Sequence, residues 1–551
     1  MASSGGRGGA VEGTKGMAPL TGRSVVVQLF IDLLILLLSS LLFALSFPSF
    51  LSNWGWFPLA FISVVPVFIV VHRNGWLATV LFGALYGYTS YSIFNFWLRN
   101  FHPLAHIIVP VLYGGYFVLL FPILKLADKL FPRWGYLLQA GIWITYEYLR
   151  TLGFLGYSYG ILGYSQYLFL PLIRIASVTG VWGVSLLVLF PSVYLGNALK
   201  DGISGFTQFI RRHKWEAFAF GAIFVASIGY GLSVKKDFSD QPSWRVALIQ
   251  QNIDPWHGGD DAYRKSLEIH TKLSEEAEKS DPDIIIWSET AFVPGIDWHT
   301  RFRTNQERYR LVKQLTEYLE GREIPYIIGN DDRQLANPAL DPTERNRIDY
   351  NAVLHYEGNR IVDTYRKIRL VPFTESFPFK EQLPGIYKWL KDADTHFWEK
   401  GSEYTVFEAG GVRFSTPICY EDSFGSLSRA FINEGAQVIA NITQDSWSKS
   451  VAAEMQHMTM SVLRAVENKR TVVRSTNGGI TCTIEPDGKI TSMLEPFTEN
   501  ILVHDVPVYE GKRTLYTRWG DWFAMFLSIV SAIMLLFGIV KSIVVRVRRR
   551  D

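Results

Sequence analysis

The sequence predicts a polytopic α-helical membrane bundle that carries a layered α/β domain outside the bilayer. Its composition and its apolar stretches predict the membrane bundle, and alternating strand and helix patterns after Trp244 predict the α/β domain. The chain has 551 residues, which is long for one domain, and 48% of them are hydrophobic while only 19% are charged. Apolar stretches of about 20 residues, the length that crosses a bilayer, recur along its first half. The net charge of +3 is too small to indicate a nucleic-acid partner.

The membrane part is predicted from these apolar stretches. They begin near Val26, recur up to Leu232 and appear once more after Trp522, and we count seven before the long polar region and one after it. Eight transmembrane helices are therefore predicted. The first stretch is longer than a signal-peptide core and no small-residue cleavage site follows it, so we interpret it as a retained helix. Asp32 lies within it and is expected near the interface or facing the bundle.

Basic residues predict the orientation, because Lys and Arg accumulate in cytoplasmic loops. With the N-terminus inside, the cytoplasmic side holds Arg7, Lys15, Arg23, Arg73, Lys125, Lys129, Arg133, Lys200, Arg211, Arg212, Lys214 and the tail from Lys541 to Arg550. The predicted domains are a disordered cytoplasmic N-terminus (1–25), a seven-helix bundle (26–234), an extramembrane catalytic domain (235–520), and an eighth transmembrane helix with a basic cytoplasmic tail (521–551).

From Trp244 onward the pattern changes to alternating strands and helices. Strands are predicted at 244–253, 281–290, 324–330, 412–419 and 436–443, helices at 265–279, 309–319 and 453–468, and hairpins at 350–367 and 471–490. Short buried strands that alternate with helices indicate a layered α/β domain. Functional groups are expected where its strands end.

Three such ends carry reactive groups. Glu289 ends the strand I-I-I-W-S-E, Lys367 and Glu375 lie in Y-R-K-I-R-L-V-P-F-T-E-S-F-P, and Cys419 ends F-S-T-P-I-C. A thiol, an ammonium and two carboxylates are the groups needed for acyl transfer through a thioester, because a carboxylate can take the thiol proton and a lysine can stabilise the oxyanion. Each residue also has an ordinary interpretation: a solvated glutamate, a surface lysine, a buried small cysteine. Asp422 could equally cap the following helix.

Together these stretches resemble the nitrilase (carbon-nitrogen hydrolase) superfamily. The match includes I-I-I-W-S-E-T-A, P-I-C-Y-E-D, N-I-T-Q-D-S-W and R-S-T-N-G-G-I-T, in the same order and strand context. The bundle adds G-F-L-G-Y-S-Y-G-I-L-G-Y-S-Q and T-G-V-W-G-V-S, which narrows the resemblance to the membrane-embedded apolipoprotein N-acyltransferases. The resemblance covers nearly the whole chain after the first 25 or so residues, and it implies that the α/β domain is an α-β-β-α sandwich.

The resemblance also implies residue roles. It makes Glu289 the general base, Lys367 the oxyanion stabiliser and Cys419 the nucleophile. Supporting residues are Glu375, the second carboxylate, and the neighbours of the nucleophile, Tyr420 and Glu421. The family commonly has Pro and Gly where this chain has Ser288 and Thr374, which puts the local backbone there in question.

Weaker matches concern substrate binding. Trp256 resembles a family tryptophan near the active-site entrance, and Gly156 and Pro378 are further candidates for substrate contact. Hydrophobic loops between Leu383 and Glu399 would lie on the lipid surface as a lid, or simply pack their aromatic residues under a loop.

The implied activity is lipoprotein maturation. Cys419 would take an acyl chain from a phospholipid such as phosphatidylethanolamine and pass it to the α-amino group of the diacylglyceryl-cysteine of an apolipoprotein. The enzyme would lie in the bacterial inner membrane with its catalytic domain on the periplasmic side. No cofactor and no metal are implied: His457 has no paired ligand spacing and is interpreted as a packing residue.

Two other functions stay open. A membrane-tethered nitrilase-type amidase would use water as the acceptor and would not depend on a lipid donor. A non-catalytic relative that binds lipid or lipoprotein would need no reactive groups, so the presence of Glu289, Lys367, Glu375 and Cys419 disfavours it.

Overall fold

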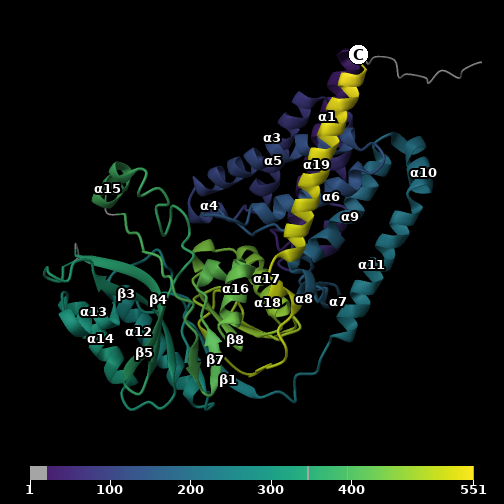
Figure 1. The fold of residues 1–551 in the computed structure, drawn as a ribbon. Helices are drawn as coiled ribbons and strands as arrows, with labels where there is room; N and C mark the ends of the chain where they lie inside the picture. Colours follow the sequence, from purple (N-terminus) through teal and green to yellow (C-terminus); the bar gives the residue numbers. More distant parts are fainter. Residues whose placement is uncertain (1–21, 344–345, 394, 550–551) are drawn as a thin grey trace, which may run out of the picture.

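A computed structural model describes residues 22–343, 346–393 and 395–549. Most of the segment for which disorder is predicted, 1–21, lies outside the described residues. Apolar helices form a bundle at one end of the molecule, and two sheets with covering helices form the other (Figure 1). The chain leaves the bundle through α11 and returns to it through α19.

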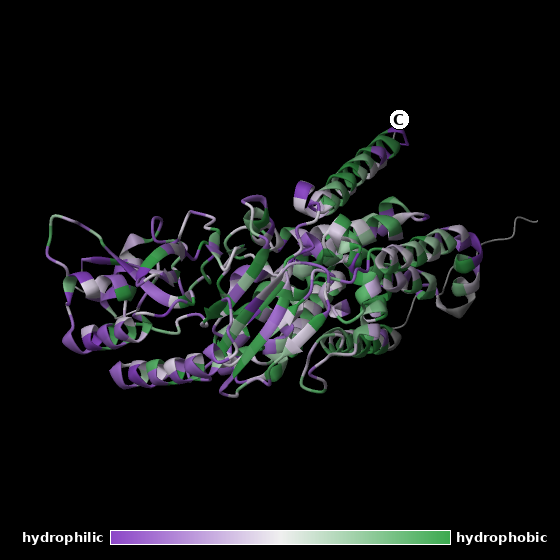
Figure 2. Ribbon diagram, turned by 90° about the horizontal axis from the view of Figure 1, so that it is seen from below, coloured by the Kyte–Doolittle hydropathy of each residue, from purple (hydrophilic) through white to green (hydrophobic). Residues whose placement is uncertain are grey.

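The bundle is built by helices before the first strand and by the last helix of the chain. They are α1 (Gly22–Leu45), α2 (Val65–Arg73), α3 (Trp76–Phe94), α4 (Leu98–Phe101), α5 (Ala105–Leu130), α6 (Gly135–Leu149), α7 (Leu170–Ile173), α8 (Ala176–Thr179), α9 (Val181–Leu199), α10 (Gly202–Arg212), α11 (Lys214–Ser233) and α19 (Trp522–Arg548). Figure 2 shows hydrophobic residues along most of these helices, whereas the outer helices of the sandwich are mainly hydrophilic.

Six helices in the described part of the chain are long and apolar enough to cross a membrane: α1, α3, α5, α9, α11 and α19. By this criterion of length and hydrophobicity, the described residues contain six membrane-spanning helices rather than the predicted eight. The apolar segment Phe57–Arg73, which contains α2, is shorter, and α6 has only 15 residues. Asp32 faces the interior as predicted, fully buried, with an ion pair to Arg73 and a hydrogen bond from Asn74 Nδ2 at 2.6 Å.

The α/β domain has two six-stranded sheets. The first has the order β12-β1-β2-β3-β4-β5 and the second β11-β10-β9-β8-β7-β6. The strands are β1 (Ser243–Gln250), β2 (Ile284–Ile286), β3 (Tyr326–Leu335), β4 (Arg347–Glu357), β5 (Arg360–Arg366), β6 (Phe407–Ala409), β7 (Val412–Ser415), β8 (Val438–Thr443), β9 (Thr471–Thr476), β10 (Cys482–Ile484), β11 (Ile490–Met493) and β12 (Asn500–Pro507). In each sheet the three central strands run parallel.

Alternation of side chains along the strands explains the layers. In β1, Val246 and Leu248 face the second sheet, while Ala247 and Ile249 face the helices on the outside. The outer helices of the first sheet are α12 (Asp260–Glu278) and α14 (Gln306–Leu319), and those of the second are α16 (Gly425–Asn433) and α17 (Val451–Asn468). The remaining helices are α13 (Ile296–Phe302), α15 (Pro384–Asp392) and α18 (Leu515–Trp519). This is an α-β-β-α sandwich.

Helix α17 belongs to both halves of the molecule. Its residues are almost all buried, because one side packs on the second sheet and another side contacts the bundle. Gln456 donates to Pro48 O at 2.8 Å and accepts from Trp97 Nε1 at 2.9 Å, and Glu467 accepts from Val181 N at the start of α9 at 2.9 Å. The bundle and the sandwich therefore share one buried layer.

Candidate active site

The structure brings the predicted reactive groups to one end of the sandwich. Glu289 follows β2 by three residues and Lys367 follows β5 directly. Strand β2 is shorter than predicted, and the chain turns after Glu289, where Thr290 adopts a left-handed backbone (φ 47°). Gly329 on β3 allows this turn to pass close by: a Cβ there would lie 2.2 Å from Ser288 O.

Lys367 lies between two carboxylates. Its Nζ is 3.1 Å from Glu289 Oε1 and 2.7 Å from Glu375 Oε1, and its side chain is fully buried. Burial alone would lower the pKa of Lys367, but Glu289 and Glu375 raise it well above the usual range. Burial also raises the pKa of Glu375, against the effect of Lys367. The lysine is therefore a permanent cation at this position.

Besides Lys367, two donors from other parts of the chain hold Glu289. Asn351 Nδ2 on β4 donates to Oε1 at 2.8 Å, and the backbone N–H of Gln444, just after β8, donates to Oε2 at 2.8 Å. Glu375 is tied down in a similar way, because Val371 N donates to its Oε2 at 2.8 Å. Such donors fix both carboxylates in one geometry.

Cys419 begins a short 3-10 turn, Cys419–Ser423, four residues after β7. Its backbone is left-handed (φ 49°), which is rare for a residue with a side chain and projects the half-buried thiol out of the strand end. Burial raises the pKa of the thiol well above its usual value; Glu289 adds to this and Lys367 opposes it. The thiol is protonated at rest, so an attack requires a base at that moment.

Glu421 braces the turn from beneath. Its Oε2 accepts from Ile418 N at 2.8 Å, and its Oε1 accepts from Ile368 N at 2.8 Å and Arg369 N at 2.9 Å. The Tyr365 hydroxyl reaches both oxygens. Burial raises the pKa of Glu421 to about 7, although the backbone donors oppose this. One carboxylate thus connects the residue before Cys419 with the two residues after Lys367.

Comparison with known proteins identifies the family. The chain matches the model of the carbon-nitrogen hydrolase family over residues 245–514 and that of the apolipoprotein N-acyltransferase N-terminal domain over residues 39–194. Apolipoprotein N-acyltransferase 1 of Treponema denticola is 41% identical over 94% of this chain and 98% of its own length, and that of Treponema pallidum is 39% identical over 94% and 97%. The chain belongs to the apolipoprotein N-acyltransferase family. As a member it is an acyltransferase with a carbon-nitrogen hydrolase domain.

Solved structures add a more distant likeness. Nit3 of Saccharomyces cerevisiae, a member of branch 10 of the nitrilase superfamily, is 17% identical with a TM-score of 0.35, covering 49% of this chain and 92% of Nit3.

Behind the thiol of this family member lies a charged network that the sequence analysis missed. Cys419 Sγ donates to Asp445 Oδ1 at 3.9 Å, and His457 lies between Asp445 and Asp422, 2.8 Å from an oxygen of each. Arg474 forms ion pairs with both aspartates. The interpretation of His457 as a packing residue is therefore wrong. Burial lowers its pKa, but the two aspartates outweigh this and raise it to about 9.

Asp422 does not cap a helix, which corrects the other sequence-based alternative. It is fully buried, and besides His457 and Arg474 it accepts from Ser461 Oγ on α17. His457 and Arg474 lower its pKa, although burial alone would raise it. Three members of this network, Asp422, Asp445 and Arg474, lie in stretches quoted for the resemblance, and their charges there were the available signal; His457 lies outside them.

The weaker candidates of the acyltransferase lie around this centre. The Tyr420 hydroxyl donates to Gly156 O, which links the nucleophile turn to a loop of the bundle. Pro378 lines a cavity of about 370 Å³ together with Tyr420. Trp256 is half exposed, and its ring packs on Phe101 at 5.7 Å rather than on the reactive groups.

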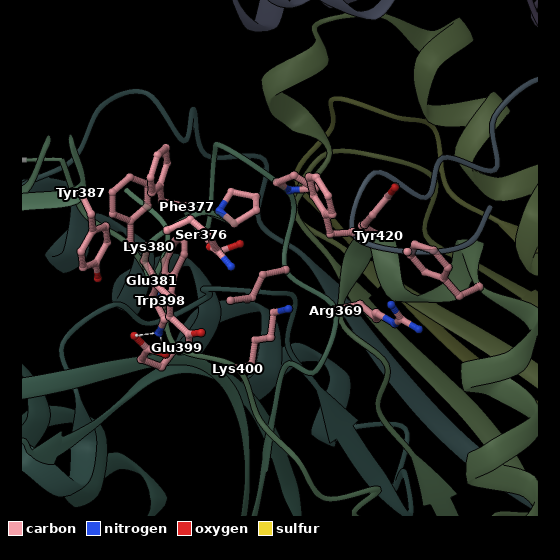
Figure 3. A pocket seen from close by; sticks show the side chains of 18 residues that line it. Arg369, Ser376, Phe377, Lys380, Glu381, Tyr387, Trp398, Glu399, Lys400 and Tyr420 are labelled. Carbon is pink, nitrogen blue, oxygen red and sulfur yellow. Dashed lines mark hydrogen bonds and ion pairs between the residues drawn. The ribbon is translucent and has the colours of Figure 1, made fainter. Parts of the chain in front are cut away.

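That cavity opens between the bundle and the segment 376–400. Figure 3 shows Tyr420 and Arg369 on one side and Phe377, Tyr387 and Trp398 on the other. Helix α15, which lies in this segment, has no buried residue, and Trp389 is 67% exposed. The segment is therefore an arm beside the cavity (Figure 1) whose helix is exposed, while its aromatic residues Phe377, Tyr387 and Phe397 pack on one another.

Proposed function

We propose that this chain transfers an acyl chain from a phospholipid to the α-amino group of the N-terminal diacylglyceryl-cysteine of apolipoproteins. Family membership supports the reaction class. The observation that carries the mechanism is Lys367, buried between Glu289 and Glu375 at the end of the sandwich where the half-buried Cys419 follows β7. The donor is proposed to be a lipid such as phosphatidylethanolamine, because the neighbouring cavity lies against the bundle.

The first half of the proposed reaction makes a thioester. Glu289 takes the thiol proton while Sγ attacks the ester carbonyl carbon, and the Lys367 ammonium stabilises the oxyanion with the backbone N–H of Tyr420. The C–O bond to glycerol then breaks, and protonated Glu289 returns its proton to the leaving oxygen. A lysophospholipid departs and the acyl chain stays on Cys419.

The second half consumes the thioester. The neutral α-amino group of the acceptor attacks the thioester carbonyl, and Glu289 takes a proton from the nitrogen. The C–S bond breaks and the thiolate regains that proton. Glu375 keeps Lys367 in place through both halves, because its Oε1 bonds Nζ and its Oε2 bonds the loop at Val371.

We also propose the full membrane topology. The segment Phe57–Arg73 and α6 are counted as two further crossings in addition to the six long apolar helices. This makes seven crossings before the sandwich and one after it. The basic loops then lie in the cytoplasm, and the sandwich lies on the periplasmic side of the inner membrane. The domain limits proposed are 26–234, 235–520 and 521–551.

Intact-protein mass spectrometry of the full chain in phospholipid micelles tests the first half. We expect an added acyl mass on the wild type that hydroxylamine removes, and none on Cys419→Ser. If the folded wild type forms no adduct with any phospholipid but releases acid or ammonia from an amide, the amidase hypothesis replaces this one.

A further inference from the structure

A second polar cavity lies at the other end of α17. It has a volume of about 280 Å³ and is lined by Arg174, Tyr230, Lys469, Asp487, Tyr509 and Lys512, among others. Lys469 follows the C-terminus of α17, whereas His457 of the active-site network lies twelve residues earlier on the same helix. At 1.5 Å per residue the two positions are about 18 Å apart. The cavity is therefore separate from the one beside Cys419.

Cations gather around Tyr509, which lines this cavity together with Lys469 and Lys512. Lys236 Nζ lies 5.1 Å and Lys469 Nζ 5.4 Å from the centre of its ring, and Arg470 is 5.9 Å away. Lys236 also donates to the Tyr509 hydroxyl at 3.2 Å. We call Lys236, Lys469, Arg470 and Lys512 the Tyr509 cluster.

The carboxylates nearby are already engaged. Asp487 is paired with Arg174 at 2.6 Å, and Glu510 accepts from Gln437 Nε2. In the described part of the chain, no carboxylate lies within 4 Å of any cation of the Tyr509 cluster. The cluster is a local excess of positive charge.

Two cations of this cluster, Arg470 and Lys469, are at least partly buried, so water does not fully solvate their charge. Arg470 is only 7% exposed; two of its nitrogens donate to Lys469 O and Gly511 O, and its Nε has no partner. Burial lowers the pKa of Lys469, and the neighbouring Lys236 lowers it further. The C-terminal dipole of α17 favours cations here, but it cannot replace a counter-ion for a buried arginine beside a half-buried lysine. The site calls for an anion.

The wall of the cavity indicates where the anion comes from. Tyr230 and Val234 lie at the end of α11, a membrane-span candidate of which only 11% is buried. Leu232, Val225 and Ile223 on this helix are each more than half exposed. An acyl chain can lie along this apolar surface while its head group reaches the cations at the helix end.

We propose that the Tyr509 cavity binds the phosphate of a phospholipid with net negative charge. The lipid's phosphate oxygens would accept from Lys469 and Lys512, and its chains would lie along α11. This rests on α11 crossing the membrane but not on the acyl-transfer reaction, so the two proposals fail independently.

Native mass spectrometry of the full chain in detergent, titrated with phosphatidylglycerol or phosphatidylethanolamine, tests the site. The wild type should retain phosphatidylglycerol more strongly, and Lys469→Met and Lys512→Met should each weaken it about tenfold. The matched control is Lys489→Met, which removes an exposed lysine from the nearby β10–β11 turn without touching the cavity lining. Cys419 acylation should persist in all three variants.

The proposal is overturned if both cluster variants retain phosphatidylglycerol as well as Lys489→Met does. It is also overturned if inorganic phosphate displaces the lipid fully at equal concentration, because the site would then be one for a free anion. Should Lys469→Met not fold, Lys512→Met decides, since Lys512 is exposed and supports no core packing.

Discussion

Replacing Glu421 by glutamine would test whether the brace beneath the nucleophile matters to the chemistry. Every group that contacts the carboxylate is a donor: the N–H groups of Ile418, Ile368 and Arg369, and the hydroxyl of Tyr365. Glutamine has the same shape but carries an NH₂ in place of one oxygen, so one position must set a donor against a donor.

The free-energy cost of this substitution follows from the contacts of Glu421. An NH₂ in place of Oε1 would face two backbone N–H groups, whereas in place of Oε2 it would face only Ile418 N. The second orientation loses one charge-assisted hydrogen bond and leaves one buried N–H unpaired, which together cost about 3 kcal/mol. Ile418 directly precedes Cys419, so we place this cost on the geometry of the nucleophile. At 1.36 kcal/mol per tenfold, acylation should slow about 100-fold.

The assay is the single-turnover rate at which the hydroxylamine-labile acyl mass appears on the chain. Tyr365→Phe, which keeps all three backbone bonds and leaves no N–H unpaired, should slow acylation only about tenfold, since one hydrogen bond to a charged group contributes about 1.5 kcal/mol. Glu408→Gln, at an exposed position of β6, is the matched control. An unchanged thermal unfolding profile with a Glu421→Gln rate within about threefold of wild type would refute the reasoning.

Three further predictions concern the surroundings of the site. The pKa of His457 is raised to about 9, so the stability that its charge contributes is fully present below pH 6.5 and is lost as the pH rises through 9. Tm should fall by roughly 5 °C across that range. His457→Gln should flatten this dependence of Tm on pH. Gly156→Ala places a Cβ 2.4 Å from Thr151 O, so the loop must shift away from Tyr420 and acylation should fall about tenfold. The exposed Gly75→Ala, whose Cβ would have no neighbour within 4 Å, should leave the rate unchanged. Trp389→Ser should leave Tm within about 1 °C, because the side chain is exposed, but slow acylation from vesicles several-fold relative to a soluble short-chain ester.

Most strands along the chain and the places of the reactive groups after them could be predicted, because both depend on local patterns. Buried strands such as β8 are short runs of apolar residues, and Glu289 comes three residues after such a run. Lys367 ends the predicted hairpin and directly follows β5. Two features of the strands were not predicted, because they do not follow from the local apolar pattern. Strand β12 alternates weakly and is placed by pairing with β1, and β2 is limited to Ile284–Ile286 although its apolar pattern extends further.

The partners of the reactive groups could not be predicted, because they come from distant parts of the chain. Asn351 reaches Glu289 from 62 residues away and Gln444 from 155. His457 was interpreted from its helix neighbours alone, which are apolar, whereas its two aspartates lie 12 and 35 residues before it. Side-chain hydrogen bonds between such separated residues leave no periodic signal in one sequence.

Under the proposed function, two of the contacts between the bundle and the catalytic end bring a carbon-nitrogen hydrolase site within reach of lipid. Helix α17 presents His457 to the thiol network and Gln456 to the bundle from adjacent positions, so the floor of the site is anchored in the membrane part. The second contact, from Tyr420 to Gly156, puts the turn that carries Cys419 against a loop of the bundle. Under the proposed topology, a substrate that enters through the cavity between that loop and the arm would arrive from the side of the bilayer. Under the proposed function, this arrangement brings an ester carbonyl to Cys419 while its acyl chain stays in apolar surroundings.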